Sequence, residues 1–107
     1  MPKLHVPESA VQHQITDALA VGQWVWAHHP DSRRLEGDPG LPDLIAVHRT
    51  TGRLVFVECK GTRGRLSKGQ KEWLGLLKTA GVETLVVTPE TVDVVARDLV
   101  QERRRKR

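Results

Sequence analysis

Two short apolar runs separated by a turn constrain the fold of this chain more than any other feature. The runs span residues 43–49 and 54–60, and the Thr-Thr-Gly-Arg segment between them has the length and composition of a hairpin turn. Both runs are apolar on both faces, which is typical of a sheet covered by helices rather than of one that faces water. The sequence therefore predicts a β-hairpin inside an α/β domain.

The segments around the hairpin predict the other elements. In chain order we expect a helix from Glu8 to Val21, a strand from Gln23 to His29, a mobile flap at residues 30–41, the two hairpin strands, a helix capped by Ser67 that runs to Ala80, a strand from Thr84 to Thr88, and a helix that starts at Thr88-Pro89. The order is αβββαβα. One mixed β-sheet flanked by helices is the most economical architecture for it.

Length and charge limit the classes of partner. A chain of 107 residues has the size of one domain, which we place at residues 1–102, followed by a basic tail at 103–107. The formal charge of +4 indicates an anionic polymer as the partner, with the tail adding non-specific affinity for phosphates. The sequence has no long apolar run of the kind that would predict membrane association. The single cysteine, Cys59, and the lack of a signal peptide predict a reducing, cytoplasmic setting.

Three charged residues gather at one end of the predicted hairpin. A turn centred on residues 51–52 places Asp43 opposite Lys60 and diagonal to Glu58. Because side chains alternate along a strand, all three project from the same face. The diagonal relation puts the β-carbons of the two carboxylates about 7–8 Å apart, a gap that a hard cation can bridge. Two carboxylates and one ammonium indicate a site for a metal ion and a phosphate.

This residue set matches the needs of phosphodiester hydrolysis. Asp43 and Glu58 are expected to bind Mg²⁺ or Mn²⁺, and the backbone carbonyl of Cys59 is a candidate third ligand. Lys60 either orients or deprotonates the attacking water, or stabilises the transition state, and these roles stay open.

Further motifs connect this site to a known family. They are Gly40-Leu41-Pro42-Asp43-Leu44, then Glu58-Cys59-Lys60, then Ser67, Gln70, Trp73, Leu77 and Gly81. With them the chain, from about Glu8 to Thr88, resembles the VRR-NUC (virus-type replication-repair nuclease) family of the PD-(D/E)xK nuclease superfamily.

The resemblance implies a restriction-endonuclease-like core and a Mg²⁺-dependent endodeoxyribonuclease. It implies metal ligands at Asp43 and Glu58, a catalytic Lys60, and supporting roles for Gln70 and Glu8. It also implies a stand-alone, phage-like form, in a bacterial or phage-infected cell, that cuts branched DNA such as Holliday junctions. Such a substrate needs two symmetrically placed cuts, so we expect a homodimer whose contacts come from the Trp24–Trp26 face and the first helix.

Each functional assignment has a structural alternative. The Asp43, Glu58 and Lys60 trio could be ordinary charges at strand ends. Gln70 stands three residues after Ser67, so it could serve only in a capping box, and Glu8 could only stabilise the start of its helix. Trp24, Trp26 and Trp73 could stack on bases, but large aromatic side chains at this spacing more often pack in the core, and we assign Trp73 to the core.

Cations that flank the acidic end of the hairpin are the expected contacts to DNA phosphates. They are Arg33, Arg34, Arg63, Arg65, Lys68 and Lys71. Two other function classes remain open, namely a catalytically silent nucleic-acid-binding module and a sequence-specific restriction-type enzyme.

Overall fold

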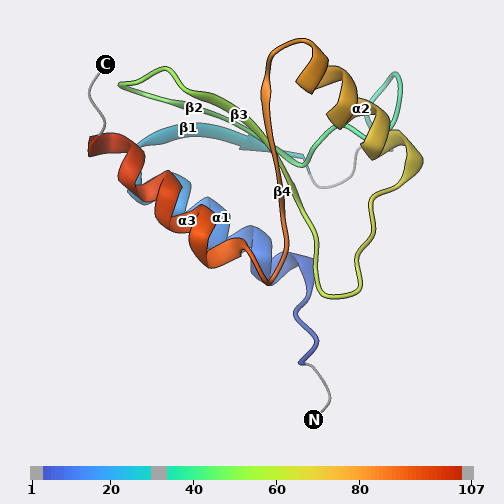
Figure 1. Cartoon of the computed structure of the whole chain (residues 1–107), viewed down its shortest axis with the longest axis horizontal. Helices are drawn as coiled ribbons and strands as arrows, with labels where there is room; N and C mark the ends of the chain where they lie inside the picture. Colours follow the sequence, from blue (N-terminus) through green and yellow to red (C-terminus); the bar gives the residue numbers. More distant parts are fainter. Residues whose placement is uncertain (1–3, 30–33, 105–107) are drawn as a thin grey trace.

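The computed structural model describes residues 4–29 and 34–104, which form one four-stranded sheet with helices on both of its sides (Figure 1). The elements are α1 (Glu8–Val21), β1 (Trp24–His28), β2 (Leu44–His48), β3 (Leu54–Cys59), α2 (Lys68–Thr79), β4 (Glu83–Val87), α3 (Val92–Gln101) and a short 3₁₀ helix, η2 (Glu102–Arg104). The strand order is β1-β2-β3-β4, with antiparallel pairs up to β3 and a parallel pair between β3 and β4. This confirms the predicted αβββαβα order and the mixed sheet, and the arrangement is consistent with a restriction-endonuclease-like fold.

The core lies between the sheet and the pair of helices α1 and α3. Ile15 and Leu19 of α1 and Leu99 of α3 are fully buried against Leu44 and Val57 of the sheet. Each such aliphatic side chain contributes roughly 1.5–3 kcal/mol through burial. These core residues recur at helical spacing in α1 and α3 and at every second position in β2 and β3. The sequence pattern therefore indicates which residues form this layer.

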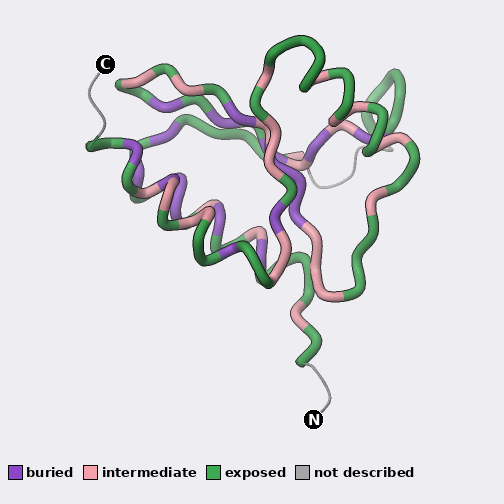
Figure 2. The backbone as a smooth tube through the Cα atoms, in the orientation of Figure 1, coloured by how far each residue is buried: buried purple, intermediate pink, exposed green. Residues whose placement is uncertain are grey.

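The opposite face of the sheet is only partly covered, so the expectation that helices cover both faces of the hairpin strands is wrong for β2 and for Leu54 at the start of β3. Apolar side chains on this face are 37–51% exposed: Val25, Ile45, Val47, Leu54 and Val86. The covering helix α2 contacts β4 and has no buried residue of its own (Figure 2). Trp73 on α2 is half-buried rather than part of the core, because α2 lies at one side of this face.

The hairpin turn lies one residue earlier than predicted, at residues 49–52. The buried imidazole of His48 organises it: Nδ1 accepts hydrogen bonds from the backbone N–H groups of Thr50 and Thr51, each at 3.1 Å. The N–H of Gly52 donates to the carbonyl of His48 at 3.0 Å, and Gly52 adopts a φ of +73° that favours glycine.

This shift changes the strand register by two residues. Leu44 pairs with Val57, so the register continued by one step places Asp43 opposite Glu58. The predicted opposition of Asp43 and Lys60 is therefore wrong. The prediction that Asp43, Glu58 and Lys60 share one face of the sheet still holds, because moving the partner strand by two residues does not change which side chains point to which face.

The loop before β2 packs against α2. Residues 30–33 of the expected flap lie outside the described part of the chain. Further along, Gly40 has a φ of +109°, and a Cβ atom there would lie 2.3 Å from the backbone of Gly69 in α2. The loop and the start of α2 are thus in direct backbone contact.

The last helix begins later than predicted. The segment Thr88-Pro89 forms a turn, in which the N–H of Val92 donates to the carbonyl of Thr88 at 2.9 Å, and α3 starts at Val92. None of the described helices is both long and apolar enough to cross a membrane.

Candidate active site

Three strand ends meet at one end of the sheet. β1 ends at His28, β2 begins at Leu44, and β3 ends at Cys59, and the first two of these residues are direct partners. Asp43 immediately precedes β2, and its Oδ2 accepts a hydrogen bond from the backbone N–H of Cys59 at 3.2 Å. Lys60 immediately follows β3. The fold therefore places Asp43, Glu58 and Lys60 together.

Glu58 is the most strongly perturbed group of this cluster. Its side chain is 1% exposed, and both Gln70 Nε2 at 3.1 Å and Lys60 Nζ at 3.5 Å contact the same oxygen, Oε2. The other oxygen, Oε1, is buried without a hydrogen-bond partner. Burial, and then the negative charge of Asp43, raise the pKa of Glu58 from its ordinary 4.5 to about 8. The site holds more negative charge than Lys60 offsets.

Glu8 reaches the site from the first turn of α1. Its Oε1 lies 4.0 Å from Lys60 Nζ. Two hydrogen bonds fix the chain just before α1 to the segment after β3: the N–H of Val6 donates to Thr62 Oγ1 at 2.8 Å, and the N–H of Thr62 donates to the carbonyl of Val6 at 2.9 Å. Partial burial, and then Asp43, raise the pKa of Glu8.

Gln70 forms the capping box considered from the sequence and also contacts Glu58. Its Oε1 accepts from the backbone N–H of Ser67 at 2.8 Å, and its own N–H donates to Ser67 Oγ at 3.1 Å, which is a capping box. Its Nε2 is left free to donate to Glu58. One side chain thus begins α2 and orients the buried carboxylate.

Cys59 points its thiol away from this cluster, into the core. The thiol is fully buried, and burial raises its pKa to about 12, so it stays protonated. The backbone N–H of Cys59 donates to Asp43, whereas the next N–H, that of Lys60, donates to Val87 on the other neighbouring strand. Because the carbonyl of a strand residue points in the same direction as its own N–H, the carbonyl of Cys59 points toward β2, the side on which Asp43 lies.

The cluster fits a divalent cation held partly by protein and partly by water. Across residues 4–29 and 34–104, no three His, Cys, Asp or Glu side chains form a ready-made metal cage. Mg²⁺ does not require one, since it is usually held by one or two carboxylates and retains several waters. The orphaned Oε1 of Glu58 is the free acceptor that such an ion would use.

The predicted phosphate contacts flank this site. Arg63 and Arg65 lie on the loop that leads from β3 to α2, and Lys68 and Lys71 lie on the first turn of α2, all of them exposed. Arg34 is exposed in the loop before β2, and Arg33 lies outside the described residues.

Sequence reasoning did not predict the contacts that tertiary structure adds beside the site. Gln12 of α1 lies 2.7 Å from His28 at the end of β1, Nε2 to Nε2. His29 contacts the carbonyl of Pro42 at 2.8 Å, directly beside Asp43. A helix and a strand end far apart in the sequence carry no shared motif that would have revealed these contacts.

Comparison with known proteins agrees with this geometry. No curated protein is similar enough in sequence to count as a relative. A solved structure described as a VRR_NUC domain protein has the same fold, with a TM-score of 0.60 and 20% identity over 92% of this chain and 89% of that chain. Residues 7–90 match the VRR-NUC domain family, so the chain belongs to that family of nucleases.

Proposed function

We propose that this protein is a metal-dependent DNA endonuclease that hydrolyses phosphodiester bonds in branched DNA such as Holliday junctions. The observation that carries the proposal is the buried, unpartnered Oε1 of Glu58 beside Asp43. A buried polar atom without a partner costs free energy, and a catalytic role or a bound ion is among the reasons for which native structures retain one. A cation held by Asp43 and Glu58 would remove this cost.

Asp43, Glu58 and the backbone carbonyl of Cys59 would hold Mg²⁺ or Mn²⁺. When bound, the ion supplies positive charge that offsets charge developing on the phosphoryl oxygens and lowers the pKa of a water ligand. Lys60, 3.5 Å from Glu58 Oε2, is positioned to orient or deprotonate the attacking water or to stabilise the transition state. Gln70 fixes the orientation of the Glu58 carboxylate, and Glu8 holds the Lys60 ammonium.

The resemblance to the family implies branched DNA as the substrate class, and two features of the chain favour cleavage without sequence preference. The flanking Arg63, Arg65, Lys68 and Lys71 suit phosphates of any sequence, and the described residues contain no element dedicated to reading base edges. Two symmetric cuts in a junction require two sites, so we propose that the enzyme acts as a homodimer.

The test is cleavage of a labelled four-way junction beside a linear duplex of the same sequence. We expect both strands of the junction to be cut with Mg²⁺ or Mn²⁺, and no cutting with Ca²⁺ or with excess chelator. Full activity in chelator would refute the metal mechanism. Binding without cleavage under all conditions would identify a silent binding module, and cleavage of the duplex at one sequence would identify a restriction-type enzyme.

A further inference from the structure

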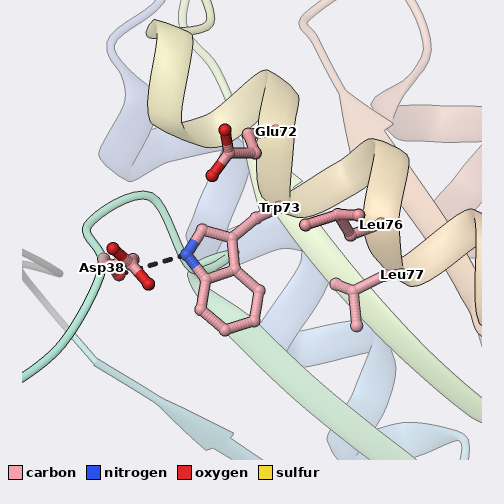
Figure 3. A pocket seen from close by; sticks show the side chains of 5 residues that line it. All are labelled: Asp38, Glu72, Trp73, Leu76 and Leu77. Carbon is pink, nitrogen blue, oxygen red and sulfur yellow. Dashed lines mark hydrogen bonds between the residues drawn. The ribbon is translucent and has the colours of Figure 1, made fainter.

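A pocket of about 210 Å³ lies between α2 and the loop before β2. Its lining residues are Asp38 from the loop and Glu72, Trp73, Leu76 and Leu77 from α2 (Figure 3). The indole of Trp73 forms one wall, and the two leucines extend the apolar surface along the helix. Leu76 is 62% exposed, so the pocket opens to solvent. The catalytic cluster described above does not use these residues.

The walls of the pocket are fixed to each other. Trp73 Nε1 donates a hydrogen bond to the backbone carbonyl of Asp38 at 3.1 Å, as drawn in Figure 3. The backbones of Gly40 and Gly69 touch so closely that a Cβ atom on either residue would clash with the other segment. The loop and α2 therefore hold the indole in one orientation before any ligand arrives, which lowers the entropy cost of binding.

The pocket lies one helical turn from the candidate active site. Gln70, whose side chain donates to Glu58, is three residues before Trp73 on α2. Residues three apart lie on the same side of a helix, about one turn of 5.4 Å along its axis. The exposed Lys68 and Lys71 lie on the same stretch of helix. A DNA strand with its phosphate at Glu58 would therefore bring an adjacent nucleotide to Trp73.

We propose that this pocket binds one unpaired nucleobase next to the scissile phosphate. The base stacks on Trp73, and its exocyclic amino group donates a hydrogen bond to the carboxylate of Glu72. The proposal rests on the proposed nuclease function. The volume is below the range of about 300–1,000 Å³ typical of drug-sized ligands, which suits a fragment as small as a base. Aromatic side chains provide sequence-tolerant stacking surfaces for single strands.

The carboxylates decide which bases fit best. Asp38 and Glu72 make the rim acidic, which disfavours a phosphate inside the pocket and favours a hydrogen-bond donor. Glutamate accepts from the N4 amino group of cytosine, whereas thymine has no exocyclic amine. A cytosine beside the scissile phosphate should therefore bind better than a thymine.

The test measures binding in excess chelator, so that it does not depend on cleavage. Fluorescence anisotropy at low salt compares labelled single strands of equal length: oligo-dC, oligo-dT, and an abasic strand with the same phosphates. We expect the wild-type protein to prefer oligo-dC to the abasic strand by roughly tenfold. Trp73→Ala should remove this preference, and Trp73→Phe should retain most of it. Trp26→Ala, which changes a 40% exposed tryptophan outside the pocket, should leave the preference unchanged.

A second variant keeps the test decisive if Trp73→Ala does not fold. Glu72→Gln should lower the preference for oligo-dC over oligo-dT, while its affinity for the abasic strand should equal or exceed that of the wild type because a negative charge near the phosphates is removed. Equal affinity of the wild-type protein for base-containing and abasic strands would overturn the pocket, even if junction cleavage succeeds. Discrimination that depends on Trp73 in a protein that cuts no DNA would support the pocket and refute the nuclease proposal instead.

Discussion

At the scale of single residues, the environment of Glu58 is the feature that most clearly indicates a functional site. Its carboxylate is buried, yet both protein donors contact one of its oxygens and leave the other without a partner. Burial and the charge of Asp43 make the ionised form unfavourable in the metal-free protein. Groups perturbed in this way cluster at functional sites, and the free energy they cost is supplied by the surrounding core.

The raised pKa of Glu58 predicts how the stability of the metal-free protein depends on pH. The folded state keeps a proton on Glu58 up to about pH 8, whereas the unfolded chain releases it near 4.5. Between these values the folded state binds more protons, so the free energy of unfolding should fall as the pH rises through this window. Melting temperatures in chelator should show this decline, and Glu58→Gln should flatten it. An equal decline in Glu58→Gln and in the exposed-residue control Glu36→Gln would contradict the assignment.

Removal of the central charges should separate chemistry from binding. We expect Asp43→Ala, Glu58→Ala and Lys60→Ala each to lower the rate of junction cleavage by roughly 100-fold or more. The two carboxylate variants should bind DNA as well as the wild type or better, because each removes negative charge near the phosphates. Asp17→Ala and Lys78→Ala, which change exposed charges elsewhere, are the matched controls. Near wild-type cleavage by any folded variant of the trio would refute the site.

At the scale of elements, the starts of α1 and α2 position the side chains of the site. α2 begins at a capping box whose glutamine also contacts Glu58, and α1 begins beside the segment that follows β3. Each helix start therefore combines a local hydrogen-bonding role with a role in the active site.

Ser67 and Gln70 allow these two roles to be measured separately. Ser67→Ala removes the cap alone and should lower the free energy of unfolding by about 0.5–2 kcal/mol with little change in cleavage rate. Gln70→Ala should lower both stability and cleavage rate, although it should lower the rate less than changes of the central trio. Thermal melting and single-turnover cleavage are the measurements. Equal rates in the two variants at matched stability would leave Gln70 with the capping role alone.

Gly61 and Gly75 form a second matched pair. A Cβ atom on Gly61 would lie 2.5 Å from the carbonyl oxygen of Val6 and 2.6 Å from the backbone nitrogen of Glu8. Gly61→Ala should therefore displace the start of α1, and with it Glu8, and lower cleavage together with melting temperature. Gly75 lies inside α2 with open space around it, so Gly75→Ala should raise stability by roughly 0.5–1 kcal/mol and leave cleavage unchanged. Unchanged cleavage in Gly61→Ala would show that the position of Glu8 does not matter.

At the scale of the whole molecule, the two faces of the sheet differ in kind. The Trp24–Trp26 face and α1 were expected from the sequence to contact a second copy. Trp24 and the apolar stripe of α1 instead pack inside the monomer, where the Trp24 indole N–H donates to the carbonyl of Leu99 at 2.9 Å, while Trp26 is 40% exposed. The opposite face of β1 and β2 exposes apolar side chains instead, including Val25, Ile45 and Val47. This open face is the better candidate for the dimer contact.

Light scattering tests that assignment. We expect the wild-type protein to have the mass of two chains at micromolar concentration, and Val47→Lys to have the mass of one chain because it places a charge in the middle of the open face. Val94→Lys, at a 68% exposed position on α3, should stay dimeric. A wild-type mass of one chain, with junctions cut by unlinked single nicks, would refute the paired-site proposal and leave the nuclease assignment intact.

The sequence by itself determined the elements, their order and the faces of the strands. Apolar periodicity and alternation are local properties of a chain, so α1 was predicted with its observed bounds, and Asp43, Glu58 and Lys60 were correctly placed on one face. The capping box of Gln70 was likewise visible because it is a local motif, whereas its contact with Glu58 was not predicted beyond the supporting role that the resemblance to the family implies.

Tertiary structure decided what depends on contacts between segments distant in the sequence. The register of the hairpin follows from the buried His48, whose Nε2 lies 2.7 Å from the carbonyl of Gly22 while its Nδ1 closes the turn. Arg53 holds Glu83, Asp98 and Glu102 in one cluster through salt bridges that no local pattern predicts. Coverage of the sheet depends on where α2 docks, and the environment of Glu58 depends on three separate elements. Local propensity sets which elements form, but burial and charge at a site are sums over neighbours that only the packed chain supplies.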